Sequence, residues 1–210
     1  MRIALINENS QVIKNNLIFN TLKKVADKYN HEVYNFGMIN ESDPNLTYVE
    51  AGLMAGILIN SKTVDFCVMG CGTGSGAMLA ANSFPNVFCG LIVDPTDAYL
   101  FSQINAGNAI SIPFAKGFGW GAELTLENIF NELFKEESGK GYPKERSVPE
   151  RNNREILKSV KEITNKDMLT ILKEIDQNLL KETIDRTNFK ENYNKLTKDS
   201  EIKKYIDTII

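Results

Sequence analysis

The residues best suited to chemistry lie in the run Met69-Gly70-Cys71-Gly72-Thr73-Gly74-Ser75-Gly76. Four glycines in seven positions expose backbone N–H groups, and a helix that follows adds partial positive charge, so the run favours an oxyanion or a phosphate. A thiol near a helix N-terminus has a stabilised thiolate, which lowers the pKa expected for Cys71 toward the range of an acid–base group. A base beside such amides suits proton abstraction next to a carbonyl, where an enediolate forms.

Two other interpretations of the same loop stay open. Gly72-x-Gly74-x-x-Ala77 fits a dinucleotide-binding pattern, and Asp94 lies about 20 residues further on, where a ribose-binding acid is expected. That alternative predicts an NAD(P)-dependent oxidoreductase, although the loop follows the third expected strand instead of the first. The glycines could also serve only a tight strand-to-helix turn. A Walker-type loop is excluded because no Gly-Lys-Ser/Thr sequence is present.

The elements that must position this loop alternate between short apolar runs and stretches with helical spacing, which is typical of a parallel sheet wrapped by helices. We expect strands at 2–7, 32–37, 64–70, 87–93 and 109–112. We expect helices at 11–29, 47–60, 74–83, 95–105 and 120–136. The sequence thus predicts a Rossmann-like α/β domain, a three-layer sandwich with a five-stranded parallel sheet. Ligands of such domains bind beyond the carboxyl ends of the strands.

The chain divides near residue 150. All 14 glycines and all 6 prolines precede that point, and the tail 151–210 carries apolar residues at three- and four-residue intervals amid Lys and Glu. We therefore predict a Rossmann-like sheet domain at 1–150 and a C-terminal helical extension at 151–210, packed on the sheet domain or on a neighbouring subunit.

Composition narrows the function classes. The net charge of −3 divides into −5 for residues 1–150 and +2 for residues 151–210, and neither value suggests the concentrated basic face that a nucleic-acid partner needs. No apolar run reaches the roughly 18 residues of a membrane span, and no signal-peptide pattern opens the sequence, so we expect a cytoplasmic protein with no membrane partner. Three cysteines form neither a disulfide framework nor a zinc site, because on a strand Cys67 and Cys71 lie about 13 Å apart.

The cysteine loop, continued by Ala80-Ala81-Asn82, resembles that of the ribose-5-phosphate isomerase B and galactose-6-phosphate isomerase family. The resemblance covers about residues 1–155, and the family's Rossmann-like five-stranded fold agrees with the one predicted above. It implies that Cys71 moves a proton between C1 and C2 of an open-chain sugar, with Thr73 near the ring oxygen or the moving proton. It further implies substrate-binding roles for these residues: Tyr48, Gly72, Gly74, Ser75, Gly76 and Asn105.

Departures from the family pattern concern its histidines. The family's Asp-His after the first strand is Glu8-Asn9 here, and we expect Glu8 and Asn9 to bind substrate from that position. Ile104 replaces the histidine that opens the sugar ring. His31, the only histidine, lies at the start of the second expected strand, away from the carboxyl ends. Another group therefore opens the ring, or the substrate arrives in the open-chain form, or the sugar differs from that of the best-known members.

Arginines near the end of the sheet domain bind phosphate in this family, often from the partner subunit. The candidates are Arg146, Arg151 and Arg154, because a forked guanidinium suits a phosphate dianion; Lys116 is a weaker one. The segment 113–121 is rich in aromatic residues and glycine, and we hypothesise that Phe118 or Trp120 lines the sugar pocket.

Together these observations predict an aldose–ketose isomerase of a sugar phosphate, acting through a cis-enediolate with Cys71 as acid–base. The partners expected are a small sugar or sugar phosphate and a second copy of the chain, as a homodimer or a dimer of dimers. No metal or cofactor is expected, because the amides take the electrophilic role. An isomerase of an unphosphorylated or unusual sugar and a non-catalytic sugar-phosphate-binding protein remain alternatives.

Overall fold

The computed structural model describes all 210 residues, and its centre is one parallel five-stranded sheet. The strands have the spatial order β2-β1-β3-β5-β4, which confirms the predicted α/β architecture. Every residue of the central strand β3 is buried, because helices cover both faces of the sheet. The bounds are β1 (Arg2–Asn7), β2 (Glu32–Asn35), β3 (Phe66–Cys71), β4 (Cys89–Leu91) and β5 (Ala109–Pro113).

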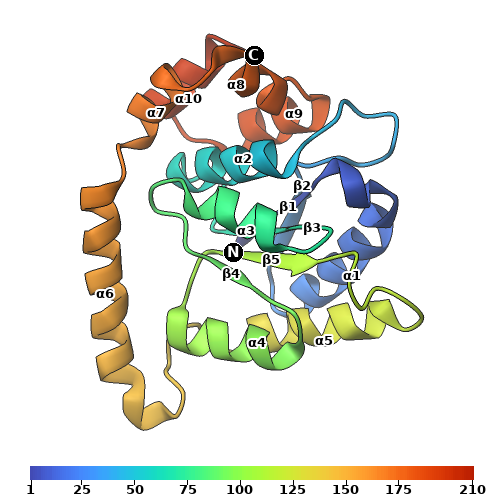
Figure 1. The fold of residues 1–210 in the computed structure, drawn as a ribbon, viewed down its shortest axis with the longest axis vertical. Helices are drawn as coiled ribbons and strands as arrows, with labels where there is room; N and C mark the ends of the chain where they lie inside the picture. Colours follow the sequence, from blue (N-terminus) through green and yellow to red (C-terminus); the bar gives the residue numbers. More distant parts are fainter.

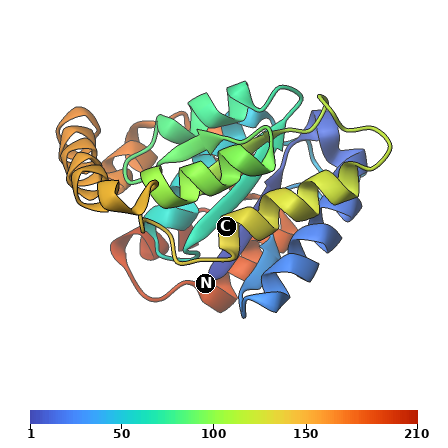
Figure 2. The same cartoon turned by 90° about the horizontal axis from the view of Figure 1, so that it is seen from below.

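Two helical layers enclose the sheet (Figures 1 and 2). The first layer contains α1 (Asn15–Lys28), α4 (Pro95–Leu100) and α5 (Ala122–Phe134), whose apolar side chains form one core cluster with one face of the sheet. The second contains α2 (Tyr48–Asn60) and α3 (Ser75–Asn82), which share a larger cluster with the other face. The three layers are those predicted.

Differences from the expected bounds have local causes. The first helix is preceded by a 3-10 turn, η1 (Asn9–Lys14), because the Glu8 carboxylate accepts the Ser10 N–H and caps that turn. The fourth helix continues as a π turn, η2 (Phe101–Asn105), which ends where Ala106 adopts a left-handed backbone. Strand β4 is shorter than expected, since the Phe88 N–H is donated to the Asn108 side chain instead of a neighbouring strand.

The C-terminal extension adds a further layer over α2. Besides the long helix at 147–164, it contains α7 (Met168–Glu174), α8 (Gln177–Ile184), α9 (Thr187–Leu196) and α10 (Glu201–Asp207), and these four lie above α2 in Figure 1. Residues 51–58 of α2 are all buried, because the sheet covers one side of the helix and the extension the other. Apolar residues of the extension therefore belong to the same cluster as α2 and α3.

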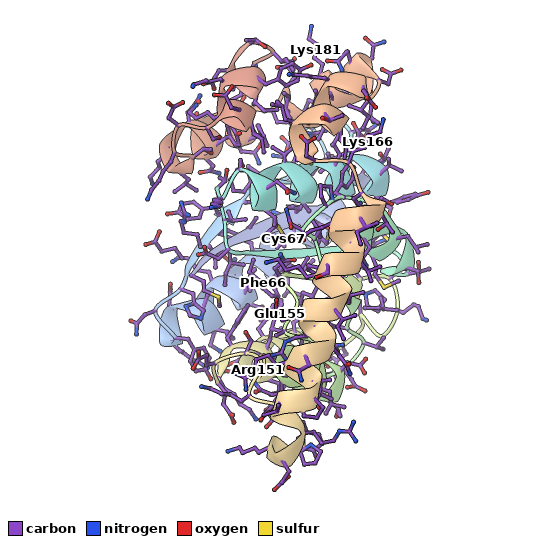
Figure 3. All side chains as sticks on the ribbon, turned by 90° about the vertical axis from the view of Figure 1, so that its left-hand side faces the viewer. Phe66, Cys67, Arg151, Glu155, Lys166 and Lys181 are labelled. Carbon is purple, nitrogen blue, oxygen red and sulfur yellow. The ribbon has the colours of Figure 1, made fainter.

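Helix α6 (Ser147–Thr164) follows the short turn η3 (Lys144–Arg146) and runs along the side of the molecule (Figures 1 and 3). Its apolar residues do not enter either core cluster. They are exposed instead, up to 85% for Ile163, and comprise Val148, Ile156, Leu157, Val160 and Ile163. No helix of the structure is both long enough and apolar enough to cross a membrane.

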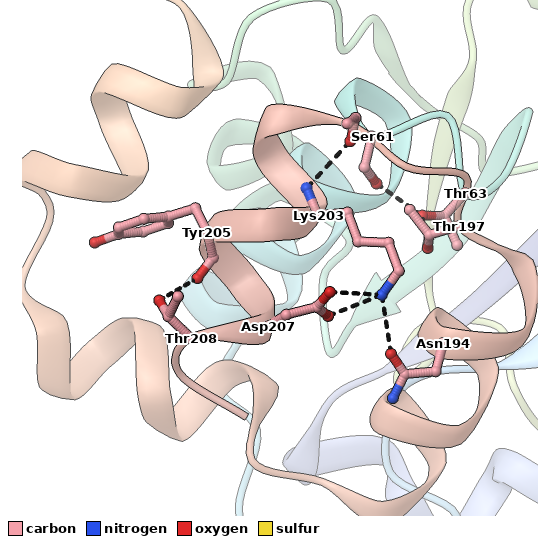
Figure 4. Close-up of polar contacts among 9 residues, drawn as sticks. Ser61, Thr63, Asn194, Thr197, Lys203, Tyr205, Asp207 and Thr208 are labelled. Atoms are coloured by element: carbon pink, nitrogen blue, oxygen red, sulfur yellow. Dashed lines mark hydrogen bonds and ion pairs between the residues drawn. The ribbon is translucent and has the colours of Figure 1, made fainter.

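Polar contacts tie the end of the chain to the sheet domain. The hydroxyls of Ser61 and Thr63, and those of Thr63 and Thr197, are each 2.7 Å apart (Figure 4). Within the extension, Lys203 bridges Asp207 and Asn194. The α9 to α10 connection is thus fixed to the loop before β3.

Candidate active site

The glycine loop lies at the carboxyl end of β3, as predicted, and bends sharply into α3. Gly74 has φ +73°, and its carbonyl accepts the Ser111 hydroxyl at 2.7 Å. A Cβ at Gly74 would lie 2.6 Å from Leu91 Cδ1, so the position requires glycine in both conformation and space. The first hydrogen bond of α3 runs from the Met78 N–H to the Gly74 carbonyl, which leaves the N–H groups of residues 75–77 without an intrahelical acceptor. Thr73 is exposed beside these amides, and Ser75 is half-buried.

Cys71 is the last residue of β3 and is 8% exposed. Its carbonyl accepts the Phe114 N–H at 3.0 Å, which fixes its backbone against the loop after β5. The other two cysteines are core residues. Burial raises the pKa of Cys67, and it raises the pKa of Cys89 to about 12, so both favour the neutral thiol. Among the three thiols, Cys71 alone lies at the carboxyl edge of the sheet.

Tyr48 stands beside the loop because α2 and α3 pack in register. A Cβ added at Gly52 would lie 2.5 Å from Ala80 Cβ, so the two helices are in very close contact there. One turn earlier in each helix, a Cβ at Gly76 would lie 3.1 Å from the Tyr48 ring. The structure thus brings Tyr48 to the amino end of α3, as the resemblance implies. Its side chain remains 46% exposed.

The segment after β1 forms the next wall. The Asn9 N–H donates to the Leu46 carbonyl at 2.8 Å, which joins this segment to the residues before α2. The Glu8 carboxylate accepts both the N–H and the hydroxyl of Ser10, so it is already engaged in capping η1. Gln11 approaches the loop, with its Nε2 3.8 Å from the position of a Cβ at Gly72.

Lys14 is a further candidate at this edge, which its place in the sequence did not indicate. Its ammonium donates to Gln11 Oε1 at 2.7 Å and to the Phe114 carbonyl, and it lies 4.5 Å from the centre of the Phe118 ring. Burial lowers the pKa of Lys14. Lys14 and Lys116 are the only cations in the five segments after the strands. This scarcity of cations is readable in the sequence, but which lysine binds Gln11, the neighbour of Gly72, depends on η1.

Of the two aromatic candidates, Phe118 lies near this edge and Trp120 does not line it. Phe118 contacts Phe114 edge to face at 6.1 Å between ring centres, and Phe114 lies against Gly70. Trp120 is fully exposed, because Gly119 and Gly121 on either side pack against nothing. The hypothesis that Trp120 forms a pocket wall is wrong for the single chain.

Asn105 and the candidate arginines lie away from Cys71. Asn105 and Arg154 line a cleft of about 310 Å³ next to Cys89, the first residue of β4. In the sheet, Cys89 of β4 and Cys67 of β3 both pair with Ala109 of β5. Along the strand direction the cleft therefore lies beside Cys67, which is four residues, or roughly 13 Å, before Cys71.

The arginines differ in their contacts. Arg154 donates to the Ile104 carbonyl at 2.9 Å, which fixes the end of η2. Arg146 is exposed and lies 3.9 Å from the Glu150 carboxylate, and Arg151 is exposed on α6 (Figure 3). A single chain therefore does not bring Asn105 or these arginines to the glycine loop.

His31 lies at the opposite, amino edge of the sheet, as expected. It lines a cleft of about 720 Å³ together with Asp65 and Phe134. Burial lowers its pKa. No imidazole is therefore present among the residues around Cys71, and no three His, Cys, Asp or Glu side chains form a cluster that could hold a metal ion.

Comparison with known proteins decides the family. Residues 3–148 match the family described as Ribose/Galactose Isomerase, and residues 163–209 match a second family described as Ribose-5-phosphate isomerase. The chain belongs to the ribose/galactose isomerase family. It is accordingly a sugar isomerase, and α6 falls almost entirely between the two matched regions. No curated protein matches the sequence.

Two solved structures agree with this one over the whole chain, and a third agrees over part of it. A 4-deoxy-L-threo-5-hexosulose-uronate ketol-isomerase complexed with a tartrate is 55% identical, with a TM-score of 0.97, over 100% of this chain and 99% of that one. A ribose-5-phosphate isomerase from Vibrio parahaemolyticus is 47% identical, with the same TM-score and coverage. The type B ribose 5-phosphate isomerase of Trypanosoma cruzi, at 18% identity and a TM-score of 0.65, covers 77% of this chain and 99% of its own, and shares the fold.

Proposed function

We propose that this isomerase converts an open-chain, unphosphorylated aldose acid of the 4-deoxy-5-hexosulose-uronate kind into the corresponding ketose. The observation that carries the proposal is the site without an imidazole: Asn9 and Ile104 stand where the resemblance expects histidines, and His31 is at the other edge of the sheet. The 55% identity to a uronate ketol-isomerase over the full length supports it.

The chemistry of such a substrate fits this site. A 4-deoxy-5-oxo hexuronate has no hydroxyl on C4 or C5, so its C1 aldehyde cannot close a five- or six-membered ring. The substrate therefore has no hemiacetal from its C4 or C5 hydroxyl for an acid or base to open. A furanose such as ribose 5-phosphate closes through its C4 hydroxyl and does need one.

In the proposed reaction Cys71 is the acid–base group. Its thiolate takes the proton from C2, and the electrons of the broken C–H bond form the C1–C2 double bond of the enediolate. The developing O1 anion faces the free N–H groups at the start of α3, which stabilise it. The thiol then returns the proton to C1 while a proton passes from O2 to O1, with the exposed Thr73 hydroxyl placed to carry it. Only protons move, so the scheme calls for no cofactor.

Substrate binding is assigned to the walls of the same edge. We assign the carbon chain and its hydroxyls to Tyr48, Asn9 and Ser75, and the loop glycines Gly72 and Gly76 to the close approach of backbone N–H groups. Lys14 is assigned to the carboxylate, since it is the cation held beside Gln11 and the glycine loop. Glu8 is assigned a supporting role through Ser10.

A second copy of the chain is proposed as the partner that covers α6. This helix exposes Ile156, Val160 and Ile163 at three- and four-residue spacing, and an exposed apolar stripe of this kind is typical of an interface. An approaching copy would also carry Asn105, Arg151 and Arg154, which do not reach Cys71 of their own chain. A homodimer, or a dimer of dimers, follows from this arrangement. We retain the cytoplasm as the proposed compartment because all three cysteines are free.

A sugar-phosphate substrate is the second candidate. It is favoured by the 47% identity to a structure named ribose-5-phosphate isomerase and by the cations Arg146, Arg151 and Arg154 near the start of α6. A dimer could bring these arginines to the partner's glycine loop, where a phosphate would replace the carboxylate.

A substrate panel in deuterated water separates the candidates. We expect NMR to show deuterium incorporation and ketose formation with the 4-deoxy-5-oxo uronate, and none with ribose 5-phosphate. Turnover of ribose 5-phosphate alone would overturn the proposed substrate and support the second candidate. Binding without exchange for every sugar would indicate a non-catalytic binding protein instead.

A further inference from the structure

The C-terminal extension reaches the active-site side of the molecule through one buried cation. Arg186, between α8 and α9, is only 4% exposed. Its Nη1 donates to the Pro44 carbonyl at 2.6 Å, and its Nη2 donates to the Asn45 carbonyl. Burial lowers the pKa of Arg186, and the nearby carboxylates of Glu50 and Asp43 oppose that shift. A buried charge without a fully matched partner costs stability, so a purely structural link would be served as well by apolar packing.

The two carbonyls held by Arg186 immediately precede the residues that contact the site. Leu46, the next residue, accepts the Asn9 N–H. Thr47 then caps α2 through a reciprocal pair of hydrogen bonds with Glu50. Tyr48 follows as the first residue of α2 and lies against Gly76. A short, continuous stretch of backbone therefore leads from the guanidinium to two walls of the site.

The other end of the same loop is also held by the extension. The Asn188 side-chain amide donates to the Asn35 and Gly37 carbonyls, at 3.1 and 2.8 Å, and the Asn192 amide donates to the Asn35 carbonyl at 3.1 Å. Gly37 in turn crosses β1 so closely that a Cβ would lie 2.2 Å from the Asn7 nitrogen. Figure 1 shows α9 above α2 and beside this loop, which joins β2 to α2.

We propose that Arg186 is a positioning residue for the isomerase reaction, which sets the backbone at Pro44 and Asn45 and thereby the placement of Tyr48 and Asn9 at the glycine loop. The inference rests on the proposed active site and gives the extension a role in substrate placement beyond covering α2. Because the fork spans two carbonyls of adjacent residues, a lysine with a single ammonium cannot hold both in the same geometry.

The test compares two forked arginines. Arg2 also joins the sheet domain to the extension, donating to the Leu196 and Lys62 carbonyls at 3.0 and 2.9 Å, but it lies at the amino end of β1. We expect Arg186→Lys to lower kcat/KM about ten- to a hundredfold, mainly through KM. Arg2→Lys should leave kcat and KM within about twofold of the wild-type values. It should lower the unfolding temperature about as much as Arg186→Lys does. Equal kinetic losses in both variants, or no loss in Arg186→Lys, would overturn the proposal.

A double-mutant cycle tests the route through Tyr48. In a Tyr48→Ala background, Arg186→Lys should cost at least threefold less in kcat/KM than in the wild type, because the placement it disturbs no longer matters. Equal costs in both backgrounds would contradict that route.

Amide exchange needs no substrate and so separates this inference from the choice of sugar. The Asn9 N–H should exchange about tenfold faster in Arg186→Lys than in the wild type, and at the wild-type rate in Arg2→Lys. An unchanged rate in Arg186→Lys would refute the positioning role even where the enzyme is active. If the Asn9 N–H exchanges faster in Arg186→Lys but the wild-type enzyme does not convert the uronate, only the proposed substrate is refuted.

Discussion

The contact between α2 and α3 offers the sharpest test of how this fold holds its site. In Gly52→Ala the new methyl group would meet Ala80 Cβ at 2.5 Å and the Ala80 carbonyl carbon at 2.6 Å, whereas ordinary contacts begin at 3.4 Å. Backbone atoms cannot rotate away, so the helices must separate by about 1 Å. Tyr48 and Gly76, one turn earlier in each helix, move with them.

Two opposing effects set the change in stability. Overpacking of this kind costs about 1–3 kcal/mol, and replacing a helical glycine with alanine returns about 1 kcal/mol. We expect a net loss of about 0–2 kcal/mol in the free energy of unfolding, measured by urea denaturation. We expect kcat/KM to fall about ten- to a hundredfold, because moving Tyr48 relative to the glycine loop by about 1 Å disturbs the placement of the substrate.

Gly119→Ala is the matched control, since a Cβ there meets nothing within 4 Å. It should leave both stability and kinetics close to those of the wild type. If Gly52→Ala proved more stable than the wild type by about 1 kcal/mol, with unchanged kcat/KM, then helix propensity alone would be acting. In that case the close contact between α2 and α3 would not determine the position of Tyr48.

Four further predictions follow from the site and from α6. Cys71→Ala should fold normally and lower kcat by about 10²–10⁴-fold; retained turnover would assign the proton transfer elsewhere. Iodoacetamide at pH 8 should alkylate Cys71 and leave Cys89 unmodified by mass spectrometry, because a pKa of about 12 keeps that thiol neutral there. Lys14→Met should raise KM at least tenfold for a carboxylated substrate while Lys116→Met does not, and equal effects would argue against the carboxylate assignment. Val160→Asp should shift the protein from dimer to monomer in size-exclusion chromatography, and a monomeric wild type would contradict the partner proposed for α6.

Much of the fold could be predicted because the signals were local. Alternating apolar runs and helical spacing indicated five strands and five helices, and all are present with small shifts at their ends. Those shifts arose where a side chain replaced a backbone partner, as Asn108 does for Phe88 and Glu8 does for Ser10. Side-chain contacts of this kind depend on residues that only the folded chain brings together.

For residues 151–210, too, the helices could be predicted but their packing partners could not. Its amphipathic helices were predicted, yet nothing in their spacing separated the apolar residues that pack on α2 from those of α6 that stay exposed. The assignment of Arg186 to the loop before α2 was equally out of reach, because residue 186 and residues 44–45 are far apart in the chain. A sequence records which faces are apolar but not which neighbour covers them.

The sequence by itself determined the kind of chemistry and its place. A cysteine within a glycine-rich strand-to-helix turn needs no distant residue to form an anion-binding loop, since its amides and its glycine conformations are local properties. Tertiary structure alone decided which side chains share that place. It brought Tyr48, Gln11 and Lys14 to the loop through helix packing and parallel strands, and it left Asn105 and Arg154 at a distance from Cys71. The reason is physical: these residues meet only where separate elements pack, and close packing fixes their distances to within about 1 Å.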